Sequence, residues 1–347
     1  TTGFPKGVQL SHFNIANDGF WIGACQNFSV RDRVCIPVPL FHCFGCVLGV
    51  MSCVNHGATM VVVEKYDAVN VMMSIEKERC TAVYGVPTMY IAILDHPLFN
   101  KFDFSSLRTG IMSGSTCPIK RMRQCVEFLN MREITNPYGL TESGPVMTQT
   151  RYFETSLERK CNSIGQALPG IEVAILNPET GELCEINEPG EICCRGFNTM
   201  KGYYKMPQQT AQVIDADGWL HSGDIGLMDG EGYYYITGRL KDMIIRGGEN
   251  ISPKEVEDFI GQMPGVQDVQ IVGVPSKKYG EQIGAFVIPM PGAEIAEGDV
   301  EDFCRNKISW FKIPKFVHFV KEFPMTASQK IQKYKLRELA AELWPDA

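Results

Sequence analysis

The chain has no surplus of basic residues. It carries 33 Lys and Arg against 40 Asp and Glu among 347 residues, a formal net charge of −7, and the basic residues are scattered. A nucleic-acid polyanion is normally met by a basic stripe or patch. The composition therefore argues against nucleic acid as the main partner, while a single nucleotide handled as a substrate remains compatible with it.

Formal charge is absent from Val34 to Val63, a stretch long enough to raise the question of a transmembrane helix. Pro37, Pro39, Asn55 and His56 interrupt it, so we predict no transmembrane segment. The pattern indicates shorter elements instead, namely a strand at 34–37, an apolar helix at about 44–55 that stops at Gly57, and a buried strand at 59–63.

A second Cys-x-x-C pair is also missing. The thirteen cysteines are odd in number and spread from Cys25 to Cys304, and Cys43 and Cys46 form the one such pair. A metal or redox site would need a further pair or a nearby ligand set. We therefore predict free thiols in a reducing compartment and a cytoplasmic location, with adjacent Cys193 and Cys194 packing on opposite faces of a strand.

Strands and helices alternate along the first half of the chain. Turns rich in Gly, Ser and Thr follow successive strands, as open α/β sheets that bind nucleotides require. We predict an α/β fold with mixed and parallel sheets in a large domain at 1–239, including a β-subdomain at about 165–235, and a small mobile α+β domain at 240–347.

Several segments could carry chemistry. Thr1 to Gly7 reads as the end of a phosphate-binding loop with a lysine, Lys6. Tyr138 to Glu142 offers an aromatic face, a hydroxyl and a carboxylate suited to Mg²⁺. Asp224 and Arg239 could serve ribose hydroxyls, and Lys330 lies in a loop of small residues. Taken alone, the segment at 1–7 is more often an ordinary turn and a loop lysine such as Lys330 more often a solvated charge, whereas 138–142 fits a capped turn as well as a site.

Together and in order, these segments resemble the acyl-adenylate-forming family of AMP-binding acyl-CoA synthetases. The resemblance runs along essentially the whole chain and rests on eight segments: 1–7, 39–42, 138–142, 190–192, 203–204, 219–226, 238–257 and 324–333. Residues 242–251 and 307–315 are most similar to fatty-acyl-CoA ligases of the acyl-CoA synthetase family member 2 type.

The resemblance implies a ligase that works in two steps. A fatty acid, expected to be of medium chain length, attacks Mg²⁺-bound ATP to give acyl-AMP and pyrophosphate, and coenzyme A then takes the acyl group and releases AMP.

The resemblance also implies roles for individual residues. These are nucleotide binding by Thr1, Thr2, Gly3, Lys6, Gly114, Ser115, Thr116, Tyr138, Gly139, Thr141, Asp224 and Arg239; catalysis by Thr141, Glu142 and Lys330; Mg²⁺ binding by Glu142; an acyl pocket at His42 and Phe44; coenzyme A binding by Gly247, Gly248 and Glu249; and a hinge at Lys241.

Two features depart from the family pattern. Gln329 stands where the family usually has Gly before its last lysine, and if the loop needs a positive φ there, Gln costs about 1 kcal/mol relative to Gly. The resemblance also implies that the N-terminal half of the large domain precedes Thr1 and is absent.

Other functions fit the same motifs. An adenylating enzyme that loads a carrier protein commonly has an Asp in the segment matching Phe41 to Gly45, and no acid occurs here between Asp32 and Glu64, which favours an uncharged acyl substrate. A luciferase-like oxygenase and a non-catalytic nucleotide-binding fragment are further alternatives. A homodimer is a candidate assembly.

Overall fold

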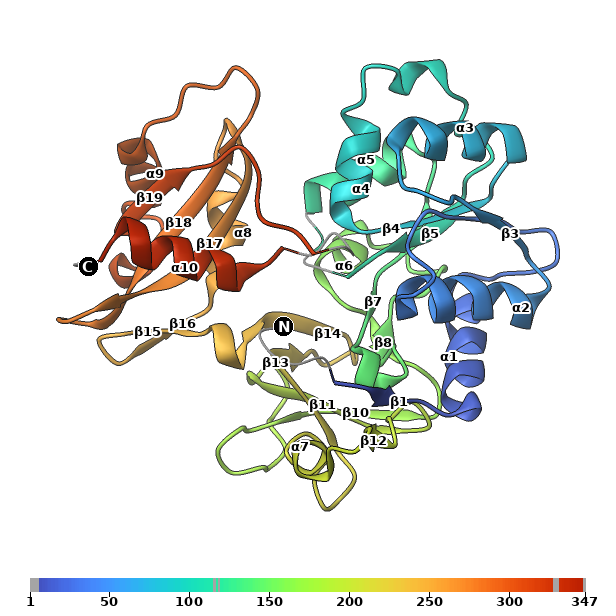
Figure 1. Cartoon of the computed structure of the whole chain (residues 1–347), viewed down its shortest axis with the longest axis horizontal. Helices are drawn as coiled ribbons and strands as arrows, with labels where there is room; N and C mark the ends of the chain where they lie inside the picture. The colour runs from blue at the N-terminus through green and yellow to red at the C-terminus, as the bar shows by residue number, and fades with distance from the viewer. Residues whose placement is uncertain (1–5, 115–116, 118, 327–330, 346–347) are drawn as a thin grey trace. The chain divides into compact units, whose positions relative to one another are not determined.

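The chain forms two compact units in a computed structural model (Figure 1). The structure describes residues 6–114, 117, 119–326 and 331–345. The large unit comprises Pro5–Ser222 and Gly226–Ile236, and the small unit comprises Gly223–Ile225 and the chain from Thr237 onward. A domain boundary at 239/240 stays a prediction. Among the described residues no helix has the length and apolar character needed to cross a membrane.

A five-stranded parallel sheet is the centre of the large unit. Its strand order is β3-β2-β4-β5-β6, with β2 (Arg33–Ile36), β3 (Thr59–Val62), β4 (Ala82–Gly85), β5 (Thr109–Met112) and β6 (Glu133–Thr135). The helices of this part of the chain are α1 (His12–Cys25), α2 (Ser52–His56), α3 (Ala68–Glu78), α4 (Pro87–Leu94) and α5 (Ile119–Phe128). Buried apolar side chains gather in two clusters around the sheet. The predicted α/β class is confirmed.

The charge-free stretch folds as short elements, as the sequence indicated. Its strands are β2 and β3, and Gly57 ends the intervening helix with a φ of +65°. The prediction that the second strand is buried was wrong, because β3 is the edge strand of the sheet and its Met60 and Val62 side chains are exposed. The helix itself differs from the prediction, because Phe44–Met51 forms a π-helix and only Ser52–His56 is α-helical. A Cβ on Gly45 would lie 2.4 Å from the carbonyl oxygen of Pro39, so the start of this helix packs too closely against the preceding loop for any side chain.

Small sheets form the rest of the large unit. β10 (Ile171–Leu176), β11 (Gly190–Gly196), β13 (Leu220–Met228) and β14 (Tyr234–Arg239) make a four-stranded sheet, with β10 and β11 antiparallel. β7 (Pro137–Tyr138), β8 (Thr148–Gln149) and β9 (Gln166–Ala167) make an antiparallel sheet, and β1 (Val8–Gln9) pairs with β12 (Gly202–Tyr203). The short helices are α6 (Leu157–Asn162) and α7 (Pro207–Ala211).

The small unit has a five-stranded sheet of its own. β15 (Ile244–Arg246), β16 (Glu249–Ile251), β17 (Val266–Ser276) and β18 (Gly280–Pro289) pair antiparallel in the order β16-β15-β18-β17, and β19 (Phe316–Phe319) joins β18 in parallel. Its helices are α8 (Pro253–Ile260), α9 (Glu297–Cys304) and α10 (Lys333–Leu343). Alternate residues of β17 enter two apolar clusters, which explains the regular pattern of this strand.

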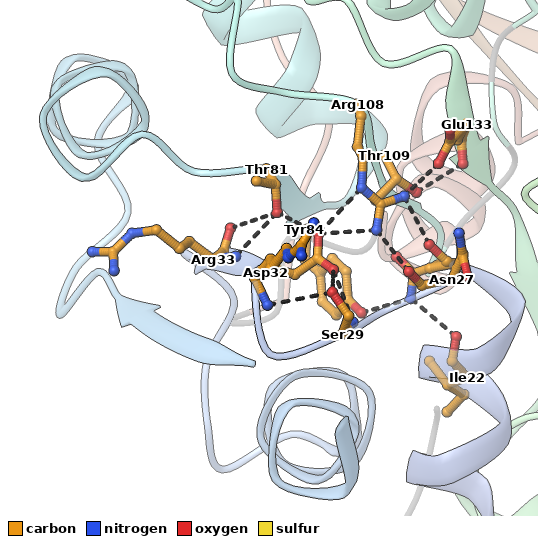
Figure 2. Close-up of polar contacts among 12 residues, drawn as sticks. Ile22, Asn27, Ser29, Asp32, Arg33, Thr81, Tyr84, Arg108, Thr109 and Glu133 are labelled. Atoms are coloured by element: carbon orange, nitrogen blue, oxygen red, sulfur yellow. Dashed lines mark hydrogen bonds and ion pairs between the residues drawn. The ribbon is translucent and has the colours of Figure 1, made fainter. Parts of the chain in front are cut away.

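Charged and polar residues connect the amino ends of the parallel strands (Figure 2). Asp32 immediately precedes β2, Thr81 precedes β4 and Arg108 precedes β5. The Thr81 hydroxyl donates to Asp32 Oδ1 at 2.7 Å, and Arg108 donates to the same oxygen through Nε at 3.1 Å and an η nitrogen at 2.9 Å. Arg108 also pairs with Glu133, the first residue of β6. The network therefore links the amino ends of four neighbouring parallel strands.

We predict that Arg108→Met lowers the free energy of unfolding by about 2 to 4 kcal/mol. The substitution leaves Asp32, whose side chain is 5% exposed, without its cation, and breaking one side of a buried ion pair typically costs about 3 to 5 kcal/mol, here reduced because Arg108 is partly exposed. Urea unfolding measures the change. Arg123→Met, at an exposed position of α5, is the matched control and should change stability little. Equal effects of the two substitutions would contradict the role of the network.

The small unit should contribute a pH-dependent term to stability. Burial, opposed by the Val269 N–H and reinforced by the charge of Glu257, raises the pKa of Asp268 to about 6 from 3.8. Below about pH 4 the carboxyl is protonated in the folded and the unfolded state, and its burial does not lower the free energy of unfolding. As the pH rises through 6 the buried group ionises, and that free energy falls. We predict that Asp268→Asn stabilises the protein by about 2 to 3 kcal/mol at pH 7.5 relative to its effect at pH 4. Urea titrations at both pH values, with exposed Asp302→Asn as control, would contradict this if the two variants behaved alike.

Candidate nucleotide and acyl site

Three segments that are far apart in the sequence meet beside Glu142. Thr141 and Glu142 lie in a short 3₁₀ helix, Thr141–Ser143, that follows β7. Tyr203 in β12 donates its hydroxyl to Glu142 Oε1 at 2.8 Å. The Lys6 ammonium lies 4.7 Å from the centre of the Tyr203 ring. The described end of the predicted phosphate loop is therefore beside the predicted Mg²⁺ ligand, with Tyr203 between them.

Main-chain pairing holds this arrangement together. β1 pairs with β12 in the register Val8 to Tyr203, and the Tyr204 N–H donates to the Gly7 carbonyl at 2.7 Å. The Met200 N–H donates to the Glu142 carbonyl at 2.9 Å. Because these contacts use backbone groups, they fix the spacing of the three segments independently of the side chains at those positions.

Gly139 makes the turn before Thr141 possible. A Cβ at this position would lie 2.1 Å from the Pro145 carbonyl oxygen, so no other residue fits. Tyr138, in β7, is 9% exposed and pairs with Thr148 of β8. Gly114 follows β5 with a φ of +94°, a conformation that favours glycine. Gly114 thus lies just after β5, and Gly139 lies directly after β7, as the sequence indicated.

The predicted acyl-pocket residues lie at the start of the π-helix. His42 Nδ1 accepts a hydrogen bond from the Phe44 N–H at 3.1 Å. Phe44 is 6% exposed and packs against Tyr84 with ring centres 6.0 Å apart, so it belongs to the core of the large unit. Between them, the Cys43 sulfur lies 3.6 Å from the Thr141 hydroxyl. Cys43 therefore connects the predicted acyl segment with the predicted phosphate residue, a contact that sequence reasoning missed.

Asp224 and Arg239 form an ion pair. Arg239 Nε donates to Asp224 Oδ1 at 2.8 Å, and the Asp224 side chain is 12% exposed. Lys241 lies two residues further on, in a 3₁₀ helix at Leu240–Asp242. Partial burial, together with the charge of Arg239, lowers the pKa of Lys241, although Asp242 and Asp224 oppose this. The two residues that the resemblance assigns to the ribose are therefore in direct contact with each other.

Gly247 and Gly248 form a tight hairpin turn between β15 and β16. Arg246 pairs with Glu249, and the two glycines have φ of +61° and +92°. A two-residue hairpin of this kind needs positive φ at both central positions. Glu249 is exposed directly after the turn. The turn therefore presents little side-chain bulk, and the Gly247 N–H donates to the Tyr279 carbonyl at 2.8 Å.

Several predicted site residues lie outside the described residues. They are Thr1, Thr2, Gly3, Ser115, Thr116 and Lys330, together with Gln329. The roles proposed for them, and for the described residues above, stay predictions.

Two protein-family models match most of the chain. The family model described as AMP-binding enzyme matches residues 1–204, and the model of the AMP-binding enzyme C-terminal domain matches 255–330. The chain belongs to the AMP-binding enzyme family. This confirms the resemblance inferred from the sequence.

Individual relatives are similar over almost all of the chain. YngI of Bacillus subtilis (strain 168), provisionally named an acyl-CoA synthetase, is 51% identical over 99% of the chain and 62% of its own length. The human mitochondrial medium-chain acyl-CoA ligase ACSF2 is 42% identical over 97% of the chain and 56% of its own length. The chain thus spans somewhat more than half the length of these relatives.

Solved structures of adenylate-forming enzymes share the fold. ATP-bound MatB from Rhodopseudomonas palustris superposes with a TM-score of 0.91 at 31% identity, over 99% of this chain and 67% of that one. The o-succinylbenzoate CoA synthetase MenE from Bacillus subtilis, in complex with its acyl-adenylate, gives 0.84 at 29% identity, over 97% and 67%.

We predict that Tyr203→Phe lowers the free energy of unfolding by about 1 to 2 kcal/mol, because it removes the hydroxyl that satisfies the Glu142 carboxylate. Tyr204→Phe is a matched control, since the neighbouring ring is 58% exposed. Thermal or urea unfolding of both variants measures the difference. An unchanged Tyr203→Phe variant would show that the hydrogen bond does not contribute to stability.

Proposed function

We propose that the protein containing this chain ligates a fatty acid, of medium chain length, to coenzyme A through an acyl-AMP intermediate, with release of pyrophosphate and AMP. The observation that carries the proposal is the meeting of Lys6, Tyr203 and the Thr141–Glu142 turn in one place. A cation, a hydroxyl and a carboxylate so arranged suit a polyphosphate and its metal ion. Relatives named as acyl-CoA synthetases and ligases support the same reaction class.

Mg²⁺ fits the residues present. Glu142 is partly exposed and one of its oxygens is held by Tyr203, so its carboxylate is oriented while remaining accessible. Mg²⁺ commonly uses one or two carboxylates together with substrate phosphates and water. When bound, the ion would supply positive charge next to the phosphates. Glu142 would hold it there, with Tyr203 fixing the carboxylate.

The protein's own groups would then position the nucleotide. Lys6, with Thr1, Thr2 and Gly3, would neutralise the outer phosphates, and Thr141 would donate to the α-phosphate. Gly114, Ser115, Thr116, Tyr138 and Gly139 would border the adenine, while Asp224 would accept from the ribose hydroxyls with Arg239 beside it. Catalysis by such groups rests on placing donors where charge develops.

The acid and the thiol would use other segments. His42 and Phe44 would border the acyl chain, and the lack of acidic residues from Arg33 to Val63 favours an uncharged substrate there. Gly247, Gly248 and Glu249 would approach coenzyme A after a rotation at Lys241. The relatives named medium-chain ligases support the chain length. A cytoplasmic location and a homodimer stay predictions, and the ACSF2 relatives are named as mitochondrial proteins.

The test uses a longer protein, because the relatives are longer than this chain. The part of Bacillus subtilis YngI that precedes the match is fused to Thr1, and fatty acids of increasing chain length are supplied with ATP, Mg²⁺ and hydroxylamine. Acid-dependent pyrophosphate release with hydroxamate formation, highest for medium-chain acids, is the expected result. Nucleotide binding without acid-dependent turnover would favour a binding-only fragment. Acyl-AMP that coenzyme A cannot accept would favour loading of a carrier protein.

Within that assay, we predict that Lys330→Ala slows adenylation about 10² to 10³-fold, or about 2.7 to 4 kcal/mol, by analogy with the loss of one oxyanion donor. Transfer from pre-made acyl-AMP to coenzyme A should change little, because the charge at the α-phosphorus develops in the first step alone. Lys335→Ala, at an exposed position of α10, is the control. Equal losses in both steps would remove the role assigned to Lys330 without affecting the proposed reaction.

A further inference from the structure

A sulfur, a nitrogen and a carboxylate oxygen converge at one point of the four-stranded sheet, within the large unit. Glu191 and Cys193 are two residues apart on β11, so their side chains share a face. His221, on the neighbouring strand β13, faces them. One ligand atom from each of the three residues lies within 4.8 Å of the other two. None of the roles proposed above uses these side chains.

The three groups meet at one ring nitrogen. His221 Nδ1 lies 2.7 Å from Glu191 Oε2 and 3.4 Å from Cys193 Sγ. Ligand atoms around a tetrahedral Zn²⁺ are about 3.5 Å apart, given bonds of about 2.0 to 2.3 Å. The sulfur is therefore already at a suitable separation. The carboxylate would need to move by less than about 1 Å from its hydrogen bond to admit the ion.

The opposite nitrogen of His221 is held by another carboxylate. Nε2 lies 3.3 Å from Asp215 Oδ2. The other oxygen of Asp215 accepts two backbone hydrogen bonds, from Asp217 at 2.9 Å and Trp219 at 2.8 Å, so this side chain is fixed by its own turn. Metal-binding histidines are commonly oriented in this way, with the second ring nitrogen donating to a carboxylate. Asp215 would keep the proton on Nε2, so that the proton between Nδ1 and Glu191 is the one lost when a metal binds.

The surroundings limit access by water. Cys193 is fully buried, the Glu191 side chain is 8% exposed and that of His221 is 29% exposed. Trp219 packs with Cys193, Ala174 and Leu176 in an apolar cluster. Exposure of His221 leaves a route for an ion and for a water molecule as a fourth ligand, while the apolar side strengthens electrostatic interactions at the site.

We propose that Glu191, Cys193 and His221 form a binding site for a divalent transition metal of the zinc class, with Asp215 as the residue that orients His221. Mixed sulfur, imidazole and carboxylate ligands select such ions over Mg²⁺ and Ca²⁺. Binding would release the thiol proton of Cys193 and the Nδ1 proton to solvent. The ion would cross-link β11 to β13 three residues before Asp224, and so would stabilise this sheet.

The experiment measures metal retention directly. The chain is stripped with a chelator under reducing conditions, incubated with Zn²⁺ and passed through a desalting column, and bound zinc is counted by mass spectrometry. The expected result is about one zinc per chain, together with a raised melting temperature. Replacing Zn²⁺ by Co²⁺ should give a thiolate-to-cobalt charge-transfer band and intense visible bands typical of a tetrahedral site.

Variants assign the ion to these residues. Cys193→Ser and His221→Gln should each abolish retention and the cobalt band, and Asp215→Asn should weaken zinc affinity about 10 to 100-fold. Cys194→Ser is the matched control, because Cys194 points to the opposite face and packs in the core of the large unit. Circular dichroism checks that each variant is folded, and Glu191→Gln, which keeps the shape of the side chain, replaces any that is not.

Two results would overturn the proposal. One is a wild-type chain that retains no zinc, in which case His221 is held between Glu191 and Asp215 by hydrogen bonds alone. The other is equal retention by the wild type, Cys193→Ser and His221→Gln, which would place the ion on other cysteines. Neither result bears on acid-dependent pyrophosphate release, so the ligase proposal is tested separately.

Discussion

The ion pair between Asp32 and Arg108 holds together the amino ends of the parallel strands. Several segments of the candidate site follow the opposite ends of these strands. The ion pair joins the residues that precede β2 and β5, and Thr81 and Glu133 extend it to β4 and β6. These strands are three or four residues long, so their opposite ends lie roughly 10 to 13 Å away. The turns that carry Gly114 and Tyr138 begin at or just beyond those opposite ends. Strand register at the charged amino-terminal ends therefore sets where the turns proposed to bind the nucleotide leave the sheet.

Much of the fold could be predicted from the sequence because its elements are short and strongly patterned. The apolar run at 59–63 matched the bounds of β3, although that strand is exposed rather than buried, and Gly57 ended its helix as expected. The π-helix at Phe44–Met51 could not be predicted, since an apolar helix has the same composition whatever its hydrogen-bond pattern. The charged network at the sheet edge was also missed. Its one signal was a polar or charged residue immediately before each buried strand.

The candidate site was predicted in pieces but not as an assembly. The motifs around Lys6, Glu142 and Asp224 each suggested chemistry, but pairing of β1 with β12 decides which of them meet. Tyr203 has no local feature that predicts a hydrogen bond to a residue 61 positions earlier. Cys193 was predicted to be a packing residue, and its burial agrees with that, but the sequence could not show that His221 of another strand would face its sulfur.

Helix α10 covers one face of the small-unit sheet but is synthesised after the strands of that sheet. Leu336 and Ala340 of α10 pack against Val272, Val274 and Phe286, on one face of the small-unit sheet, and Arg337 pairs with Asp242 at 2.6 Å. During synthesis β17 and β18 emerge from the ribosome before this helix does, since β18 ends at Pro289 and α10 begins 44 residues later at Lys333. One apolar face of the sheet thus stays uncovered while the chain is growing. A nascent protein stalled before Leu336 should be a substrate for chaperones that bind exposed apolar strands.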